Sequence, residues 1–109
     1  MEEKRLGRIR TAEFGQMEDR GFLFGLELTF DFNGSGVGSS GMYMFNISKD
    51  CKWDVKEQRS EYFMDMLEGV NDILKDAKVS HVSQLVNKPV EVTLKNRTFL
   101  SFRILTEVL

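Results

Sequence analysis

The sequence contains few of the residues that hold small proteins together by covalent or metal cross-links. It has one cysteine, Cys51, and one histidine, His81, among 109 residues. A single cysteine excludes an internal disulfide and a zinc site built from several cysteines, and it is typical of a reducing compartment. We therefore expect residues 1–109 to form a single domain that is held by a hydrophobic core, for which this length is sufficient.

Long apolar runs and an excess of positive charge are missing as well. No stretch approaches the roughly 20 apolar residues that a membrane-spanning helix needs, and the charged opening MEEKRLGRIR does not resemble a signal peptide. The formal net charge of -2 gives no global positive field to attract nucleic acid or an anionic membrane. We therefore expect a cytoplasmic protein that does not bind membranes, and the net charge disfavours a nucleic-acid partner.

Alternating apolar residues predict several strands. The clearest is FLFGLELTFDF (22–32), in which every second residue is apolar on one face. Weaker patterns predict strands over Leu6–Phe14 and Met42–Ile47. Near the end, VEVTL and FLSFRIL flank a tight turn at 95–97, which predicts a C-terminal β-hairpin.

A 3.6-residue apolar period predicts one long helix between these strands. Asp54 and Glu57 form the pattern of an N-cap with its capping-box partner, and the helix is expected to end near Lys78. The predicted buried stripe consists of Phe63, Met66, Leu67, Val70, Ile73, Leu74 and Ala77. The fold class that follows is α+β, with an antiparallel sheet of about five strands packed against one long amphipathic helix.

A glycine-rich stretch, NGSGVGSSG (33–41), matches G-x-G-x-x-G through Gly36, Gly38 and Gly41. In dinucleotide-binding proteins these glycines open a helix whose N-terminus holds the pyrophosphate. Here the next predicted element is a strand. We therefore expect a mobile hairpin loop, in which Gly, Asn and Ser tolerate positive φ angles, and no bound cofactor.

The same stretch contains half of a calcium-binding pattern. Asp31, Asn33 and Ser35 lie at alternate positions with Gly36 sixth, as at the start of an EF-hand loop. The twelfth position holds Met42 instead of a bidentate glutamate, and no predicted helices flank the loop. We expect no resident metal, and ligand or calcium binding at these three residues is the third hypothesis for function.

Residue patterns that carry catalysis are missing. Neither Cys51 nor any serine lies in the context of a nucleophile elbow. Lys49 and Lys52 would favour the Cys51 thiolate, but Asp50 opposes them. His81 lies alone near a predicted helix–strand junction. We therefore expect a protein that is not an enzyme and assign no catalytic residue.

One face of the predicted helix carries a row of carboxylates. At about 100° per residue the six acids fall in one arc opposite the apolar stripe. Like charges at such spacings cost a helix about 0.2–0.5 kcal/mol per pair, so the row opposes helix stability. Two interpretations stay open: a solvated face, or a surface that binds the basic groove of a partner protein. This acidic row consists of Glu57, Glu61, Asp65, Glu68, Asp72 and Asp76.

A basic segment precedes the first clear strand. It consists of Lys4, Arg5, Arg8 and Arg10. These side chains could pair with the acidic row, in the same subunit or in a neighbouring one. If they stay exposed, they form a candidate phosphate-binding patch, which makes nucleic-acid association the alternative function.

The oligomeric state stays open at this point. Met42, Tyr43 and Met44 are apolar neighbours in a short predicted strand. Either they are buried in the sheet, or they form the patch of a homodimer.

The chain as a whole resembles one group of sequences. It contains GRIRTAEFG, FGLELTF, a glycine-rich loop, Trp53 before the helix, and the ending KPVEVTLKNRTFLSFRILTEVL. This order resembles small uncharacterised proteins of tailed phages and prophages, although Val37 stands where those relatives carry an aromatic residue. The resemblance implies a phage or prophage origin and action in a bacterial cytoplasm, and it implies no activity. We expect an accessory protein that binds a host or phage protein through its acidic row.

Overall fold

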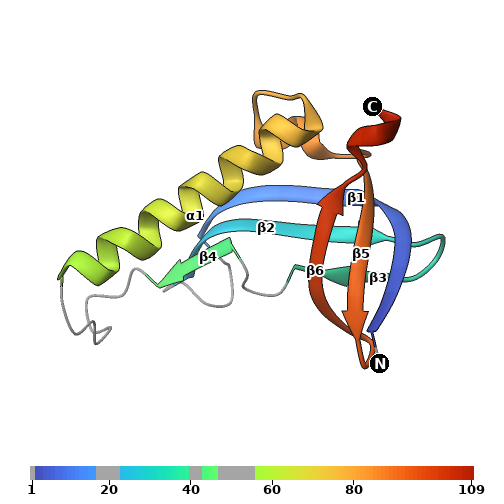
Figure 1. The fold of residues 1–109 in the computed structure, drawn as a ribbon, viewed down its shortest axis with the longest axis horizontal. Helices are drawn as coiled ribbons and strands as arrows, with labels where there is room; N and C mark the ends of the chain where they lie inside the picture. Colours follow the sequence, from blue (N-terminus) through green and yellow to red (C-terminus); the bar gives the residue numbers. More distant parts are fainter. Residues whose placement is uncertain (1, 17–22, 40–42, 47–55) are drawn as a thin grey trace.

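The computed structural model describes residues 2–16, 23–39, 43–46 and 56–109. These residues form a six-stranded antiparallel sheet with one long helix beside it (Figure 1), so the predicted α+β class is confirmed. The strands are β1 (Glu2–Gln16), β2 (Leu23–Asp31), β3 (Gly36–Gly38), β4 (Tyr43–Asn46), β5 (Pro89–Lys95) and β6 (Thr98–Ile104). The helices are α1 (Lys56–Ala77) and the short 3-10 helices η1 (Val82–Leu85) and η2 (Thr106–Val108).

Strand β1 is longer than the predicted Leu6–Phe14 and belongs to both halves of the sheet. Its first half pairs with β5, from Glu2 opposite Lys95 to Arg8 opposite Pro89. Its second half pairs with β2, from Arg8 opposite Asp31 onward. A bulge between Ile9 and Thr11 lies where β1 passes from one partner to the other, and bulges of this kind bend a strand.

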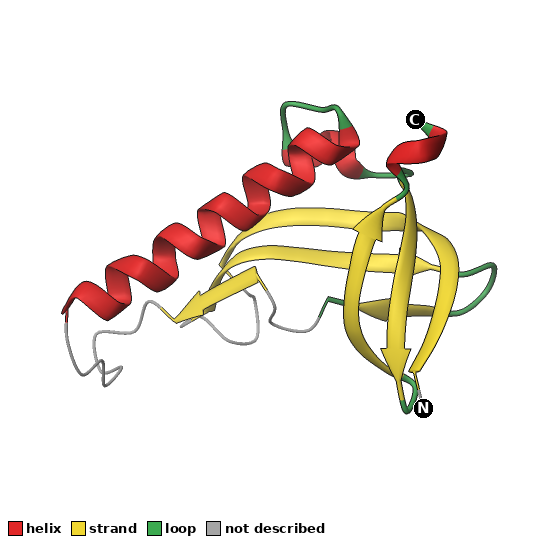
Figure 2. Cartoon of the chain, viewed as in Figure 1, coloured by secondary structure: helices red, strands yellow, loops and turns green. Residues whose placement is uncertain are grey.

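The sheet curls into a partly open barrel. The strand order is β3-β2-β1-β5-β6, with β4 pairing β2 beside β3. The two end strands, β3 and β6, approach to within 8 Å between Cα atoms, although no ladder joins them in the described residues (Figure 2). A long shared first strand, a helix between the third and fourth barrel strands and a closing hairpin resemble the arrangement of the OB-fold, a partly open Greek-key barrel of five strands.

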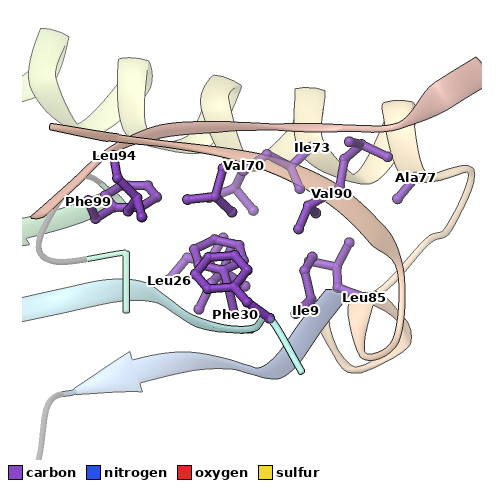
Figure 3. Packing of buried hydrophobic residues seen from close by; sticks show 14 of the residues in the cluster. Ile9, Leu26, Phe30, Val70, Ile73, Ala77, Leu85, Val90, Leu94 and Phe99 are labelled. Carbon is purple, nitrogen blue, oxygen red and sulfur yellow. The ribbon is translucent and has the colours of Figure 1, made fainter. Parts of the chain in front are cut away.

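The core lies inside this barrel and beneath α1. Leu26, Leu28 and Phe30 of β2 are fully or almost fully buried, as the alternating pattern of 22–32 predicts. The Phe30 ring stacks on Phe99 at 5.6 Å between centroids and contacts Phe102 at 5.0 Å. Figure 3 shows this ring among side chains from β5, β6 and α1. Aromatic contacts between β2 and β6 therefore help to hold the barrel where hydrogen bonds between its end strands are missing.

Two-residue turns close the β2–β3 and β5–β6 hairpins of the barrel. The predicted C-terminal hairpin is confirmed, and its turn residues Asn96 and Arg97 have φ angles of 53° and 65°. Between β2 and β3, Asn33 and Gly34 have φ angles of 65° and 104°. Positive φ at both central residues is the mark of the type I′ turn, which matches the twist of the flanking strands.

The glycine-rich stretch is therefore not the loop that the sequence predicts. The chain reverses direction at Asn33–Gly34, and Gly36–Gly38 returns as β3 along β2. No helix follows β3 directly, because the next described element is strand β4. Gly41, the last glycine of the dinucleotide-like pattern, lies outside the described residues.

Helix α1 ends as predicted, at Ala77. Lys78 follows with φ at 59°, and its amide donates to the Lys75 carbonyl while the Val79 amide donates to the Leu74 carbonyl. This pair of bonds is a Schellman motif, in which a left-handed residue closes the helix. The predicted N-cap, Asp54, lies outside the described residues.

Candidate interaction surface

The acidic row lies on the solvent side of α1. Met66, Val70, Ile73 and Ala77 form the opposite, buried side. The five acids whose side chains the structure describes are exposed, and none of them forms an ion pair within the described part of the chain. They are Glu61, Asp65, Glu68, Asp72 and Asp76, while the Glu57 side chain lies outside the description.

Packing around Tyr43 fixes the helix against the sheet. A Cβ on Gly69 of α1 would lie 3.7 Å from the Tyr43 ring, and that ring meets Phe102 edge-on at 6.1 Å. Burial raises the pKa of the Tyr43 hydroxyl. Tyr43 is therefore partly buried beneath α1, which supports the sheet interpretation of Tyr43 over an exposed patch; Met44 is half-buried and Met42 lies outside the described residues.

The buried stripe of α1 is narrower than the sequence predicts. Phe63 and Leu67 are 39% and 38% exposed, whereas Ile73 is 7% exposed. Phe63 lies in the N-terminal half of the helix, which extends past the barrel strands β5 and β6 (Figure 1), and Leu67 lies at the middle of the helix. The prediction that these two side chains are buried is wrong. At about 100° per residue, Phe63 and Leu67 lie along one edge of the stripe, on the same side as the half-buried Leu74.

Exposed apolar side chains consequently border the acidic row. Met64 is 52% exposed and lies between Glu61 and Glu68 along the helix. A shallow depression at this place is lined by Ser60, Glu61, Met64 and Asp65. We call Met64 and Leu67 the apolar flank of α1.

The basic segment is divided between two faces of β1. Arg5 pairs in register with the buried Val92, and its guanidinium lies 5.0 Å from the centre of the Phe32 ring. It also lies 3.7 Å from a Glu3 carboxylate oxygen. Gly7 makes room for Phe32, since a Cβ there would come within 2.7 Å of the ring. Arg5 is therefore occupied by contacts within the chain.

All four cations of the basic segment, Arg10 included, are exposed. Lys4, Leu6 and Arg8 occupy every second position of β1 and share one face of the strand, and Leu6 is 68% exposed. Arg8 lies opposite Asp31 in the ladder, and the two side chains form no ion pair. Within the described residues no ion pair joins this segment to the acidic row either, so the predicted pairing inside one subunit is not observed there.

The residues of the calcium-like pattern form the β2–β3 turn. Asp31 ends β2 and accepts a hydrogen bond from the Gly34 amide at 3.4 Å, and the Ser35 carbonyl accepts one from the Phe32 amide at 2.8 Å. A two-residue turn reverses the chain and does not wrap around an ion as a calcium loop does. Among the described residues no group of three or more His, Cys, Asp or Glu side chains gathers as for a metal.

One polar cluster was not predicted from the sequence. Arg103 of β6 donates to the Glu107 carboxylate at 3.0 and 3.1 Å and to Glu91 at 3.3 Å. The hydrogen bond from Arg103 lowers the pKa of Glu107. Two features of the sequence could have predicted this cluster. Arg103 and Glu107 have i,i+4 spacing, and the register of the predicted hairpin places Glu91 opposite Arg103. Through Arg103, this cluster connects Glu107 of η2 to strands β5 and β6 of the barrel.

His81, the one candidate base, is an exposed residue at the start of η1. Its amide and that of Ser80 both donate to the Gln84 side-chain oxygen, at 2.9 and 3.0 Å. These two hydrogen bonds cap the start of η1. Cys51 lies outside the described residues.

Comparison with known proteins gives no family for this chain. No family model, no curated protein and no solved structure matches it. In the described part of the chain, no helix has the length and apolar character required to cross a membrane. The interaction surface therefore has to be interpreted from its own residues.

Proposed function

We propose that this chain is a non-enzymatic protein-binding module whose acidic row docks on a basic surface of a partner protein. The supporting observation is that five exposed carboxylates share one helix face and none has a cationic partner in the described residues. Such a row opposes helix stability. An external cationic surface would compensate that cost, and complementary charge accelerates association and selects partners.

The sequence resemblance suggests in which surroundings the chain would meet its partner protein. A phage or prophage accessory protein in a bacterial cytoplasm would meet host and phage proteins. A row of carboxylates one helical turn apart is complementary in charge to a basic groove of such a protein.

A capture experiment with a charge-matched control tests the proposal. The tagged chain is compared with a variant carrying Glu61→Lys, Asp65→Lys and Glu68→Lys, using bacterial host lysate. The control reverses three exposed acids away from α1, namely Glu2, Glu13 and Glu27, which changes the net charge equally. We expect the helix variant to lose the partner and the control to retain it. Equal retention by both variants would contradict the proposal.

Nucleic-acid binding is the second candidate, and the barrel topology is the observation that favours it. OB-fold barrels frequently bind oligonucleotides, an argument by analogy of fold. Lys4 and Arg8 provide exposed cations, but the outward side of β2 carries Glu27, Thr29 and Asp31 and offers no stacking ring. This candidate predicts salt-sensitive retention of single-stranded DNA or RNA that Arg8→Gln with Arg10→Gln removes. Retention that neither salt nor these substitutions change would exclude it.

A further inference from the structure

Helix α1 combines two properties up to Glu68, just past its middle, that do not occur together in the rest of the helix. Met64 and Leu67 are 52% and 38% exposed, whereas Ile73 and Ala77 are 7% and 0% exposed. The acidic row runs along both halves. Exposed apolar side chains beside uncompensated charge are thus confined to the part of α1 that reaches beyond the barrel (Figure 1). Contiguous apolar exposure with a polar border is typical of protein-binding surfaces.

We propose that the segment Glu61–Glu68 of α1 binds a basic amphipathic helix of the partner protein. The inference rests on the proposed function and names the chemistry of the partner at the same site. The apolar flank would receive apolar side chains of the partner helix, and Glu61, Asp65 and Glu68 would pair with its lysines or arginines.

The placement of the residues favours a helix as the occupant. Met64 and Leu67 are three residues apart, so they lie one above the other on the same side of α1. Glu61 and Glu68 stand one turn before and one turn after Met64, along the edge of that apolar strip. A partner helix aligned with α1 repeats its apolar residues at i, i+3, i+4 and i+7, and therefore meets the strip along its length.

Charge and side-chain type define the partner further. The carboxylates beside Met64 form no ion pair with the described residues, so a complementary helix carries positive charge along its polar border. Met64 borders the shallow depression together with Ser60, Glu61 and Asp65. Methionine is flexible and adapts to varied apolar surfaces. The surface therefore suits a lysine- or arginine-rich helix with unbranched or branched aliphatic residues on one face.

The probe for this inference is a defined peptide set. The test peptide is a 15-residue helix with leucine at i, i+3, i+4 and i+7 and lysine on its borders. One control peptide has the same composition in scrambled order, and another has glutamate in place of lysine. We expect calorimetry with the full chain to detect the amphipathic basic peptide and neither control. Binding of the scrambled peptide with equal affinity would overturn the inference, because apolar alignment would then be irrelevant.

Matched variants locate the surface. Glu61→Gln with Glu68→Gln removes two charges beside the apolar flank, and Asp72→Asn with Asp76→Asn removes two charges from the same row beyond it. We expect the first pair to weaken peptide binding about tenfold or more and the second less than about threefold. Met64→Ser with Leu67→Ser should weaken binding by a similar factor, and circular dichroism verifies that each variant keeps its helix.

Three outcomes separate this inference from the proposed function. Equal losses from the two charge pairs would overturn the inference and leave the acidic row as a binding surface. Failure of the test peptide to bind, while a captured partner still depends on Glu61, Asp65 and Glu68, would do the same. A concentration-dependent dimer that dissociates with Met64→Ser would assign the surface to a second copy of the chain and also overturn it.

Discussion

The Ser39 hydroxyl accepts a hydrogen bond from the Leu28 amide at 3.1 Å, and the Ser39 amide donates to the Leu28 carbonyl at 2.8 Å. Ser39 is 1% exposed and Leu28 is fully buried. At the point where β3 ends, a side-chain oxygen therefore takes the place of a backbone carbonyl beside β2. The buried Leu28 amide therefore keeps a hydrogen-bond acceptor where the regular β-ladder stops.

Replacement of Ser39 by alanine tests this role. Ser39→Ala removes the acceptor of the buried Leu28 amide, so we expect the free energy of unfolding to fall by about 1–3 kcal/mol. Urea denaturation measures the change. Ser35→Ala is the control, because Ser35 is exposed and contributes its backbone carbonyl to the turn; it should alter stability by less than about 0.5 kcal/mol. Similar midpoints for both variants would contradict the assignment.

Two glycines that lie against different atoms of Tyr43 should respond oppositely to replacement by alanine. In Gly69→Ala the new Cβ meets the Tyr43 ring at an ordinary 3.7 Å. Removing a glycine from a helix interior then stabilises the fold by about 0.5–1 kcal/mol. In Gly25→Ala the Cβ collides with the Tyr43 carbonyl oxygen, and we expect a loss of at least about 1–3 kcal/mol. Thermal denaturation of both variants checks the opposite signs.

The turn between β5 and β6 contains a residue in an unfavourable conformation. Arg97 has φ at 65°, at the position where a type I′ turn prefers glycine. Arg97→Gly should therefore raise the free energy of unfolding by roughly 0.5–1 kcal/mol, since it relieves a left-handed side chain at some cost in unfolded-state entropy. Arg97→Ala is the control and keeps the Cβ, so it should stay near wild type. A larger gain for alanine than for glycine would contradict the explanation.

The Arg103–Glu107 contact gives a dependence on acid pH. Arg103 lowers the pKa of Glu107 in the folded chain, so the contact contributes stability above the ordinary carboxyl pKa of about 4.3 and loses it as pH falls through the lowered folded value. Arg103→Gln should raise the Glu107 pKa back toward its ordinary value. Carbon-detected NMR titration of the Glu107 carboxyl measures this. A midpoint unchanged by the substitution would show that another group lowers the pKa.

The elements with a local periodic signal were predictable from the sequence. Val90, Val92 and Leu94 alternate with polar residues and form a strand whose apolar side is buried, and α1 ends within one residue of its predicted end. The start of β1 was not predictable in this way. Glu2–Arg5 has no apolar alternation, and these residues are in a strand because β5 supplies the partner for their backbone. Tertiary pairing overrides a weak local pattern there.

The β2–β3 hairpin could also have been predicted, from a turn dipeptide inside the glycine-rich stretch. Asn33–Gly34 is the dipeptide most typical of type I′ turns, and it makes Gly36–Gly38 a strand. At the candidate site, the exposure of the acidic row follows from helical periodicity. The exposure of Phe63 and Leu67 does not, since both lie at the edge of the apolar stripe, where the period alone does not decide burial.

The double pairing of β1 sets the order in which the chain can fold. Glu2 pairs with Lys95 and Arg8 with Pro89, so the first half of β1 has no strand to pair with until β5 has been synthesised. Contacts this distant in sequence slow folding, because a long loop must close before they form. During translation the first half of β1 is an open strand edge, a known starting point for aggregation. Glu2–Arg5 are four consecutive charged residues, and charged side chains of this kind protect an exposed strand edge.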